Sequence, residues 1–483
     1  MSDQARYARQ LLGILAKDED RLQRIDDYVQ GEHDDPYMPE GADAEYKLLA
    51  KRSVSNWMPL LVKTPTQALY VDTFRRPGAN PSKPDDTAGS KHWQRSRLAA
   101  RQIAVHRGAV TYGHSFTVTE KVAKGVLTRG LSPMRTAALF EDPANDITPV
   151  VALTVTRKPK GEDPGKATMW DGTFKYEVTF KSYADEKSIR VSKGVRHGAP
   201  ECPVTRFAAY VDLEGRTYGV VEPMIPVQNR INQTIFDLLV AQTYASTKVR
   251  WVTGMAPPLE RYPELLPDGS PHPQAGEPVL DENGNPKPLP INHNAKRFLF
   301  AEDEQVKFGS LDETPLGGFI ESIDMSIRHL SAISQTPPHH LLGQIANLSA
   351  EALLAAETAL SRMVEEFRTS FGESWERVDS LAEVMAGELD VASLNDHEVE
   401  VIWRDMELKS LAQSADGLGK LADQLGIPKR GLWPRVPDVK KTELDEWNRL
   451  YEEESADLAI TSRLRRSSPD DAGTIADAAV VAT

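Results

Sequence analysis

Apolar residues recur every three or four positions through much of this chain, a pattern typical of amphipathic helices. It covers Tyr46–Val62, which Pro65 should close, and Trp93–Arg107. Further helices are expected at residues 1–39 (as an N-terminal helical arm), 226–248, 312–335, 350–385, 407–425 and 441–464. Most of the chain is therefore predicted to be helical.

Segments rich in β-branched and aromatic residues interrupt these helices and predict strands. They lie at residues 109–118, 150–157, 173–183, 205–211, 296–308 and 398–403. Four of them fall between residues 40 and 222, which we therefore expect to form one α+β domain. The predicted fold class is α+β and mostly helical.

Two helices flank a segment that is rich in proline. Pro226 and Pro315 stand where first-turn prolines belong, at the starts of the helices before and after it. Residues 256–290 hold ten of the 33 prolines, with tight turns expected at Asp268-Gly269 and Asn283-Gly284. Residues 249–310 are thus predicted to be a small, loop-rich module held between two helices.

The second of these helices ends abruptly in the sequence SQTPPHHLLGQIANLS, residues 334–349. Pro337 and Pro338 should stop it, and Ser349 can cap a third helix. An apolar stripe continues over roughly 35 residues of that third helix, more than an ordinary globular helix. A small core cannot cover so long a stripe, so the pattern indicates assembly with neighbouring chains.

Composition narrows the class of protein. The chain has 483 residues, with 57 basic against 71 acidic side chains and a net charge of −14, which argues against tight gripping of nucleic acid through phosphates. A protein past which DNA must slide does not require such tight binding. No apolar run reaches roughly 18 residues and no signal peptide is evident, so a cytosolic place of synthesis and no membrane partner are expected.

Several residues invite a chemical interpretation that their surroundings do not support. Cys202 is the single cysteine, which rules out an intramolecular disulfide and a cysteine-based zinc site and favours a packed thiol. Residues 161–168 resemble a Walker A loop, but only three residues separate the glycines and Ala167 replaces the hydroxyl residue that binds Mg²⁺. A glycine- and proline-rich loop is the better interpretation.

The histidines are treated in the same way. His33, followed by Asp34 and Asp35, could belong to a metal site, but a solvated turn is favoured because three adjacent residues cannot all converge on one ion. His106 and His114 lack a catalytic constellation and are expected to be core or surface residues. His339 and His340 are adjacent and should point apart, so this pair alone is not expected to bind a metal.

The order of these elements carries a resemblance to a known family. Three segments of the sequence add to the resemblance. They are VVEPMIPVQNRINQTIFDLLV at 220–240, TPPHHLLG at 336–343 followed by NLSAEA at 347–352, and LADQLGIPKRGLWP at 421–434. Together they resemble the portal proteins of tailed bacteriophages, most closely the branch common in phages of actinobacteria. The resemblance runs from about Tyr46 to Tyr451.

This resemblance implies a portal fold with wing, stem, clip and crown, assembled as a ring. It implies an N-terminal arm at 1–39, a wing at 40–222, stem helices at 223–248 and 311–335, a clip with a proline-rich insertion at 249–310, a tunnel loop at 336–349, a long helix returning to the wing at 350–408, crown helices at 409–466 and a disordered tail at 467–483. The tunnel loop would offer Gln335, Pro337, Pro338, His339, His340, Gly343, Gln344 and Asn347 to the DNA channel, and the clip would carry a basic zone of Lys248, Arg250, Lys296 and Arg297.

The function implied is a ring-shaped DNA channel at one capsid vertex, used in genome packaging, retention and ejection. The expected partners are further copies of the chain, usually twelve in a ring, double-stranded DNA bound without sequence specificity, the terminase large subunit, the major capsid and scaffold proteins, and a head–tail adaptor. The expected location is the virion, and the host cytoplasm during assembly. No catalytic residue, metal or cofactor is expected, because a separate terminase would hydrolyse ATP.

Two alternatives remain at this point. One is a minor head or connector protein with similar helical modules and no DNA channel. The other is a metal-dependent hydrolase that uses His33, Asp34 and Asp35, or His106 and His114. Replacing His106 and His114 with alanine should abolish metal binding or turnover if the enzyme hypothesis is correct.

Overall fold

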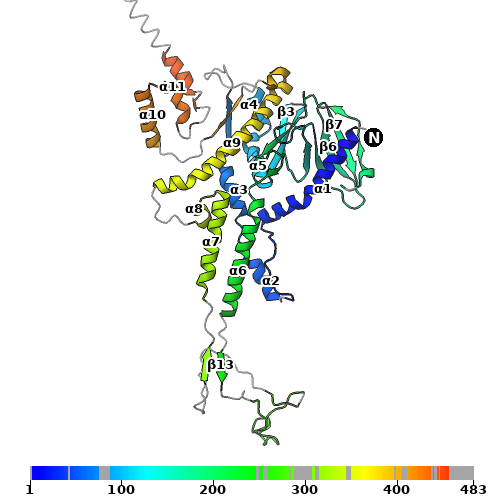
Figure 1. Ribbon diagram of the computed structural model, residues 1–483, viewed down its shortest axis with the longest axis vertical. Coiled ribbons are helices and arrows are strands. Elements are labelled where there is room, and N and C mark those ends of the chain that lie inside the picture. The colour runs from blue at the N-terminus through cyan, green and yellow to red at the C-terminus, as the bar shows by residue number, and fades with distance from the viewer. Residues whose placement is uncertain are drawn as a thin grey trace, which may run out of the picture. The chain divides into compact units, whose positions relative to one another are not determined.

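The computed structural model describes two compact units, each built from segments distant in sequence (Figure 1). The described residues are 3–41, 44–75, 88–183, 185–245, 250–253, 259–282, 284–287, 307–310, 315–343, 350–395, 399–404, 411–436, 439, 443–444 and 446–455. The first unit comprises Met1–Asp35, Val54–Ile231 and Met325–Thr483, and the second comprises Pro36–Ser53 and Asn232–Asp324. Helices and strands are mixed in the described residues, in agreement with the predicted class.

A six-stranded antiparallel sheet forms one layer of the first unit. Its strand order is β4-β5-β6-β7-β8, with β9 also paired to β7. The strands are β4 (Thr136–Leu139), β5 (Val151–Arg157), β6 (Gly165–Trp170), β7 (Phe174–Phe180), β8 (Arg190–Val191) and β9 (Val195–Arg196). The strands predicted at 150–157 and 173–183 are thereby confirmed.

Helix α1 (Asp3–Gln30) covers one face of this sheet (Figure 1). Ala8, Leu11, Leu12 and Leu15 are spaced by three or four residues, so they lie on one side of the helix. They pack into a core with apolar side chains of β5, β6 and β7, among them Phe180. The N-terminal helix is therefore an integral part of the sheet's core.

A three-stranded sheet of order β10-β2-β3 forms a second layer of the first unit. Its strands are β10 (Val204–Ala208), β2 (His114–Val122) and β3 (Gly125–Leu131), and the helices packed with it are α5 (Leu98–Tyr112) and the 37-residue α9 (Ala350–Ala386). Phe207 of β10 lies 4.7 Å from Trp375 of α9, measured between ring centroids. This long helix therefore buries much of its apolar stripe within its own chain.

Two of the predicted helices are wrong in detail. The segment predicted as one helix from Tyr46 to Val62 forms α2 (Ala44–Ser53) and α3 (Met58–Gln67), and Pro65 lies inside α3. The helix predicted from Trp93 to Arg107 is likewise split into α4 (Ala88–Arg95) and α5, because Arg97 adopts a left-handed conformation with φ 55°.

The strand predicted at 109–118 is also shifted. Residues 109–112 complete α5, and the strand begins only at His114. Gly113 separates the two with φ 97°, and a Cβ atom there would meet the Tyr218 backbone at 2.7 Å. A glycine is therefore required at this reversal.

The remaining elements of the first unit include a strand pair that joins distant parts of the chain. β1 (Val71–Arg75) pairs with β15 (Glu400–Trp403), which confirms the strand predicted at 398–403. The other elements are β11 (Tyr210–Val211), β12 (Thr217–Tyr218), α10 (Leu411–Leu425), α11 (Lys429–Leu432) and the 3₁₀ helices at Glu186–Ser188, Glu222–Met224, Val391–Asn395 and Trp433–Arg435. Within the described residues, none of the helices is both long and apolar enough to span a membrane.

The second unit contains α2 and most of α6 (Ile225–Ala245), which pack through Leu49, Ala50 and Phe236. It continues into β13 (Arg250–Thr253), which pairs with β14 (Lys307–Ser310), and the start of α7 (Gly317–Ser334) completes it. Between the strands, the described residues include the turns predicted at Gly269 and Gly284, where φ is 82° and 81°. Most of the strand predicted at 296–308 lies outside the described residues.

Candidate functional site

The break after α7 is the clearest candidate site, and its start is closed by local hydrogen bonds. Ser331 Oγ donates to the carbonyl oxygen of Thr336 at 2.6 Å, and Thr336 N donates to the carbonyl oxygen of Ser331 at 3.2 Å. Between them Gln335 adopts a left-handed conformation with φ 54°. The chain therefore leaves the helix by a defined turn.

The two prolines separate α7 from the next helix. Pro337 is extended, with ψ 139°, and Pro338 opens the short helix α8 (Pro338–Leu342). Proline has no backbone N–H to donate, so it ends one helix and fits the first turn of the next. The predicted stop is confirmed, and Gly343, at φ 65°, closes α8 by donating its N–H to the carbonyl oxygen of His339.

The exposed surface of this segment is polar without fixed charge. Gln335, Pro338, His340 and Gly343 are exposed, His339 is partly buried, and Pro337 is buried. Pro337 is thus a structural residue of the loop and does not offer a surface. Gln344 and Asn347, also predicted for this site, lie outside the described residues.

The segment is held in place by other residues of the first unit. Leu341 is buried, and its carbonyl oxygen accepts a hydrogen bond from the Trp57 indole at 3.5 Å. The Trp57 backbone N–H in turn donates to the side chain of Gln228 in α6. The position of α8 is therefore fixed by residues that precede it by more than a hundred positions.

Both histidines of α8 approach one carboxylate. Nε2 of His339 and Nε2 of His340 each lie 2.9 Å from Oε1 of Glu357, on α9. The imidazole centroids are 4.5 Å apart, with 41° between the ring planes. The adjacent rings therefore converge, contrary to the expectation that they point apart, and Glu357 is a member of the site that the sequence did not single out.

The predicted basic zone is largely outside the described part of the chain. Arg250 is the first residue of β13 and pairs with Ser310 of β14. Lys248, Lys296 and Arg297 lie outside the described residues. The zone consequently stays a prediction.

The histidines considered for catalysis have structural partners. His106 is fully buried, with Nδ1 3.1 Å from the carbonyl oxygen of Leu69 and Nε2 accepting from the Trp375 indole at 2.8 Å. Burial lowers the pKa of His106 to about 3. His114 contacts Thr217 Oγ1 at 2.7 Å, and burial lowers its pKa to about 3 as well. Both side chains lie in the packing of the first unit, as expected.

The group at His33 is a structured turn. The His33 ring stacks on Tyr28 at 4.6 Å between centroids, and its Nε2 lies 3.0 Å from the carbonyl oxygen of Tyr28. Asp34 forms an ion pair with Arg24 at 2.7 Å. In the described part of the chain, a metal-compatible group of three side chains is found at His339, His340 and Glu357 and not at this turn.

Two further sequence features are also structural. Cys202 is buried in the core between the sheets, and burial raises the pKa of its thiol to about 12, which removes its nucleophilic character. Residues 161–164 of the Walker-like segment lie in the connection from β5 to β6, whereas residues 165–168 belong to β6, so the predicted loop covers only the first half of the segment. Gly165, at the start of β6, pairs with Phe180 rather than lying in a phosphate loop.

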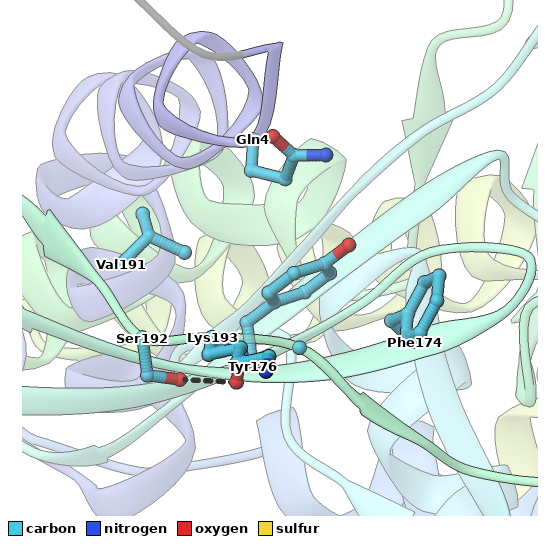
Figure 2. A pocket seen from close by; sticks show the side chains of 7 residues that line it. Gln4, Phe174, Tyr176, Val191, Ser192 and Lys193 are labelled. Carbon is cyan, nitrogen blue, oxygen red and sulfur yellow. Dashed lines mark hydrogen bonds between the residues drawn. The ribbon is translucent and has the colours of Figure 1, made fainter.

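A shallow pocket of about 370 Å³ lies between the start of α1 and strands β7 and β8. Figure 2 shows Gln4, Tyr176 and Phe174 around it, with the Ser192 hydroxyl hydrogen-bonded to the carbonyl oxygen of Lys193. Among its seven lining residues, Lys193 is the single ionisable group besides Tyr176. The Ser192 hydroxyl donates to a backbone carbonyl oxygen and not to a basic side chain, so it is not activated as a nucleophile.

Comparison with known proteins places these elements in a family. The family model described as phage portal protein, SPP1 Gp6-like, matches residues 9–457. The chain belongs to this portal protein family.

Relatives of this portal chain include two mycobacteriophage proteins. It is 30% identical to the portal protein of Mycobacterium phage D29 and 29% identical to that of Mycobacterium phage L5, each over 164 residues. The aligned part spans 33% of this chain and 33% of each relative. A solved structure titled "Neck of empty GTA particle computed with C6 symmetry" aligns with a TM-score of 0.40 and 13% identity, over 86% of this chain and 98% of that chain.

The portal family assignment confirms the resemblance read from the sequence. Portal proteins are structural components of phage particles, which agrees with the buried, partnered state of His106 and Cys202. Glu357 was missed because no local pattern marks it. It follows His340 by seventeen positions, and only the fold brings the two together.

Proposed function

We propose that copies of this chain assemble into a closed ring, of twelve subunits, that forms the DNA channel at one vertex of a phage capsid. The match of the portal family to residues 9–457 carries the proposal. In this assignment, α6 and α7 are the stem helices, the residues between them are the clip, and the segment from Gln335 to Gly343 belongs to the tunnel loop. The wing, the long helix and the crown keep the boundaries predicted from the sequence.

Ring formation is supported by α7. The stripe predicted on this helix is only partly covered in the single chain: Ile327 and Leu330 are buried, whereas Ile320 is 59% and Ile333 57% exposed. Exposed isoleucines on a long helix are expected where a second subunit will cover them. Head-to-tail contacts between identical chains form a closed ring when the rotation from one subunit to the next is a whole fraction of a full turn.

Passage of DNA is supported by the chemistry of the loop. Its described exposed residues, Gln335, Pro338, His340 and Gly343, include hydrogen-bonding groups and no arginine or lysine. Each strong phosphate contact would add salt-dependent affinity and so slow a moving duplex. A channel lined by such residues, in a chain with a net charge of −14, guides DNA without holding it.

The further partners follow from the same role. The ring would dock the terminase large subunit during packaging and a head–tail adaptor afterwards, and would sit among major capsid and scaffold proteins. The basic zone of Lys248, Arg250, Lys296 and Arg297 would face DNA or the packaging motor. The protein would be located in the virion, after assembly in the host cytoplasm.

Electron microscopy and mass determination on the purified full-length protein test the proposal. We expect rings of about a dozen subunits around a bore wide enough for a DNA duplex. A stable monomer, even when scaffold and capsid proteins are supplied, would contradict ring formation. A closed ring without an open bore would favour a connector that has no DNA channel.

A further inference from the structure

We propose that His339, His340 and Glu357 form a binding site for a divalent transition-metal ion such as Zn²⁺. The three side chains come from α8 and from α9, so the ion would join two helices of one subunit. Each residue offers one ligand atom, and these atoms all lie within 4.8 Å of one another. The site uses only residues of a single chain, so it does not depend on the ring or on DNA.

The spacing of the ligand atoms suits an ion with little movement. Both imidazole Nε2 atoms lie 2.9 Å from Glu357 Oε1. Zinc bonds of about 2.0–2.2 Å place pairs of ligand atoms about 3–3.5 Å apart. The two histidine–glutamate pairs would each move apart by a few tenths of an ångström, and the two imidazole nitrogens, which lie within 4.8 Å of each other, would take the same spacing when the ion binds.

The short helix explains how adjacent histidines can share an ion. α8 has only five residues and ends at Gly343, and its two imidazoles lie 4.5 Å apart between centroids. Glu357 approaches both rings from α9 through one oxygen atom. The carboxylate thus supplies a third ligand atom, from a direction that the two neighbouring side chains of α8 do not cover.

The donor set selects the class of metal. Two imidazole nitrogens and one carboxylate oxygen are typical ligands for zinc and its neighbours, whereas Mg²⁺ and Ca²⁺ prefer oxygen ligands throughout. Three protein ligands leave a coordination position for water. The side chains of His339, His340 and Glu357 are 12%, 34% and 32% exposed, so an ion can reach them from solvent.

A bound ion would change how the loop is anchored. It would connect α8 to α9 by coordination bonds, which are stronger than the hydrogen bond between His340 and Glu357. Metal ligation of this kind lowers the freedom of the enclosed segment. In the proposed channel, the ion would restrain the loop that faces DNA.

Calorimetric titration of the full-length, tag-free protein tests this site, after treatment with a chelator and dialysis. We expect ZnCl₂ to bind with a stoichiometry of one ion per chain, and CoCl₂ to give the visible absorption of a nitrogen- and oxygen-ligated ion. A hundredfold excess of MgCl₂ should not displace the zinc. Displacement by magnesium would overturn the assignment to a transition metal.

Variants separate this site from adventitious binding to other histidines. Glu357→Gln should weaken zinc binding at least about tenfold, and the double variant H339N/H340N should abolish it. His329→Asn on α7 and His272→Asn serve as matched controls and should bind zinc like the wild type. Equal binding by H339N/H340N and wild type, or no saturable binding by the wild type, would refute the site. Circular dichroism and mass determination establish that each variant keeps its fold and assembly.

Discussion

The indole Nε1 of Trp375 donates a hydrogen bond to Nε2 of His106 at 2.8 Å in the centre of the first unit. Both side chains are fully buried, and they join α9 to α5. His106 also contacts the carbonyl oxygen of Leu69 through Nδ1, so both ring nitrogens have partners when the imidazole is neutral. The residue considered for catalysis is therefore a buried connection between helices.

Removing the indole donor should destabilise this core. Trp375→Phe leaves the His106 nitrogen without its partner and opens a small cavity, and together these effects should lower the free energy of unfolding by about 2–4 kcal/mol. Denaturant unfolding at a fixed protein concentration measures the loss. Trp447→Phe, at a partly exposed helical position, should cost about 1 kcal/mol or less, and equal losses for the two variants would contradict the role assigned to Trp375.

The buried imidazole should also make stability depend on pH. Burial lowers the pKa of His106 to about 3, below its unfolded value, so the unfolded chain binds a proton first as the pH falls. This contribution is complete above the unfolded pKa of about 6.5 and is lost progressively as the pH falls toward 3. His106→Gln keeps a donor and an acceptor but does not titrate. Between pH 7 and pH 5 the wild type should lose about 2 kcal/mol more than this variant, and parallel losses would show that His106 does not titrate on unfolding.

The conformation of Gln335 gives a prediction about the loop itself. Its φ of 54° is unfavourable for a residue with a side chain, by about 1–2 kcal/mol. Gln335→Gly should therefore raise the free energy of unfolding by about 0.5–1 kcal/mol, after the greater entropy of glycine in the unfolded chain is subtracted. Gln335→Val should lower it, because branching at Cβ makes a positive φ more costly. Thermal unfolding of both variants checks this, and shifts of the same sign would contradict it.

The exposed part of α7 should control assembly. The double variant Ile320→Asp and Ile333→Asp should abolish rings in electron microscopy while leaving the circular dichroism spectrum unchanged, because both side chains are more than half exposed in the single chain. Ser322→Asp adds a charge to the same helix at an exposed polar position, and it should assemble like the wild type. Normal rings from the double variant would remove α7 from the subunit interface.

Local chemistry made the break after α7 predictable. Pro337 and Pro338 together remove two consecutive backbone N–H donors, which strongly disfavours a continuous helix, and the apolar stripe of α9 identified that helix before its packing was known. The boundary between α4 and α5 was missed because Arg97, an ordinary helix residue, takes a left-handed conformation that its own sequence does not favour. Its neighbours continue the apolar pattern, so the interruption depends on tertiary packing.

The candidate site also contains residues that the sequence could predict and residues that it could not. The sequence predicts the break at His339 and His340, because Pro337 and Pro338 directly precede them, but it predicts a loop where the structure has the short helix α8. It does not place Glu357 beside them, because that contact depends on how α9 is packed after the loop. Likewise, the burial of Pro337 follows from the neighbouring core and not from the character of proline, which is mostly exposed in proteins.

The pairing of β1 with β15 sets a condition on how the protein is made. Phe74 lies opposite Val401, so β1 receives its partner only after more than 300 further residues have been synthesised. Contacts between such distant residues form slowly and leave a strand edge exposed in the meantime. The nascent chain therefore carries an unpaired β1 edge until β15 is made, and the rate at which β15 reaches it should limit the yield of correctly folded subunits.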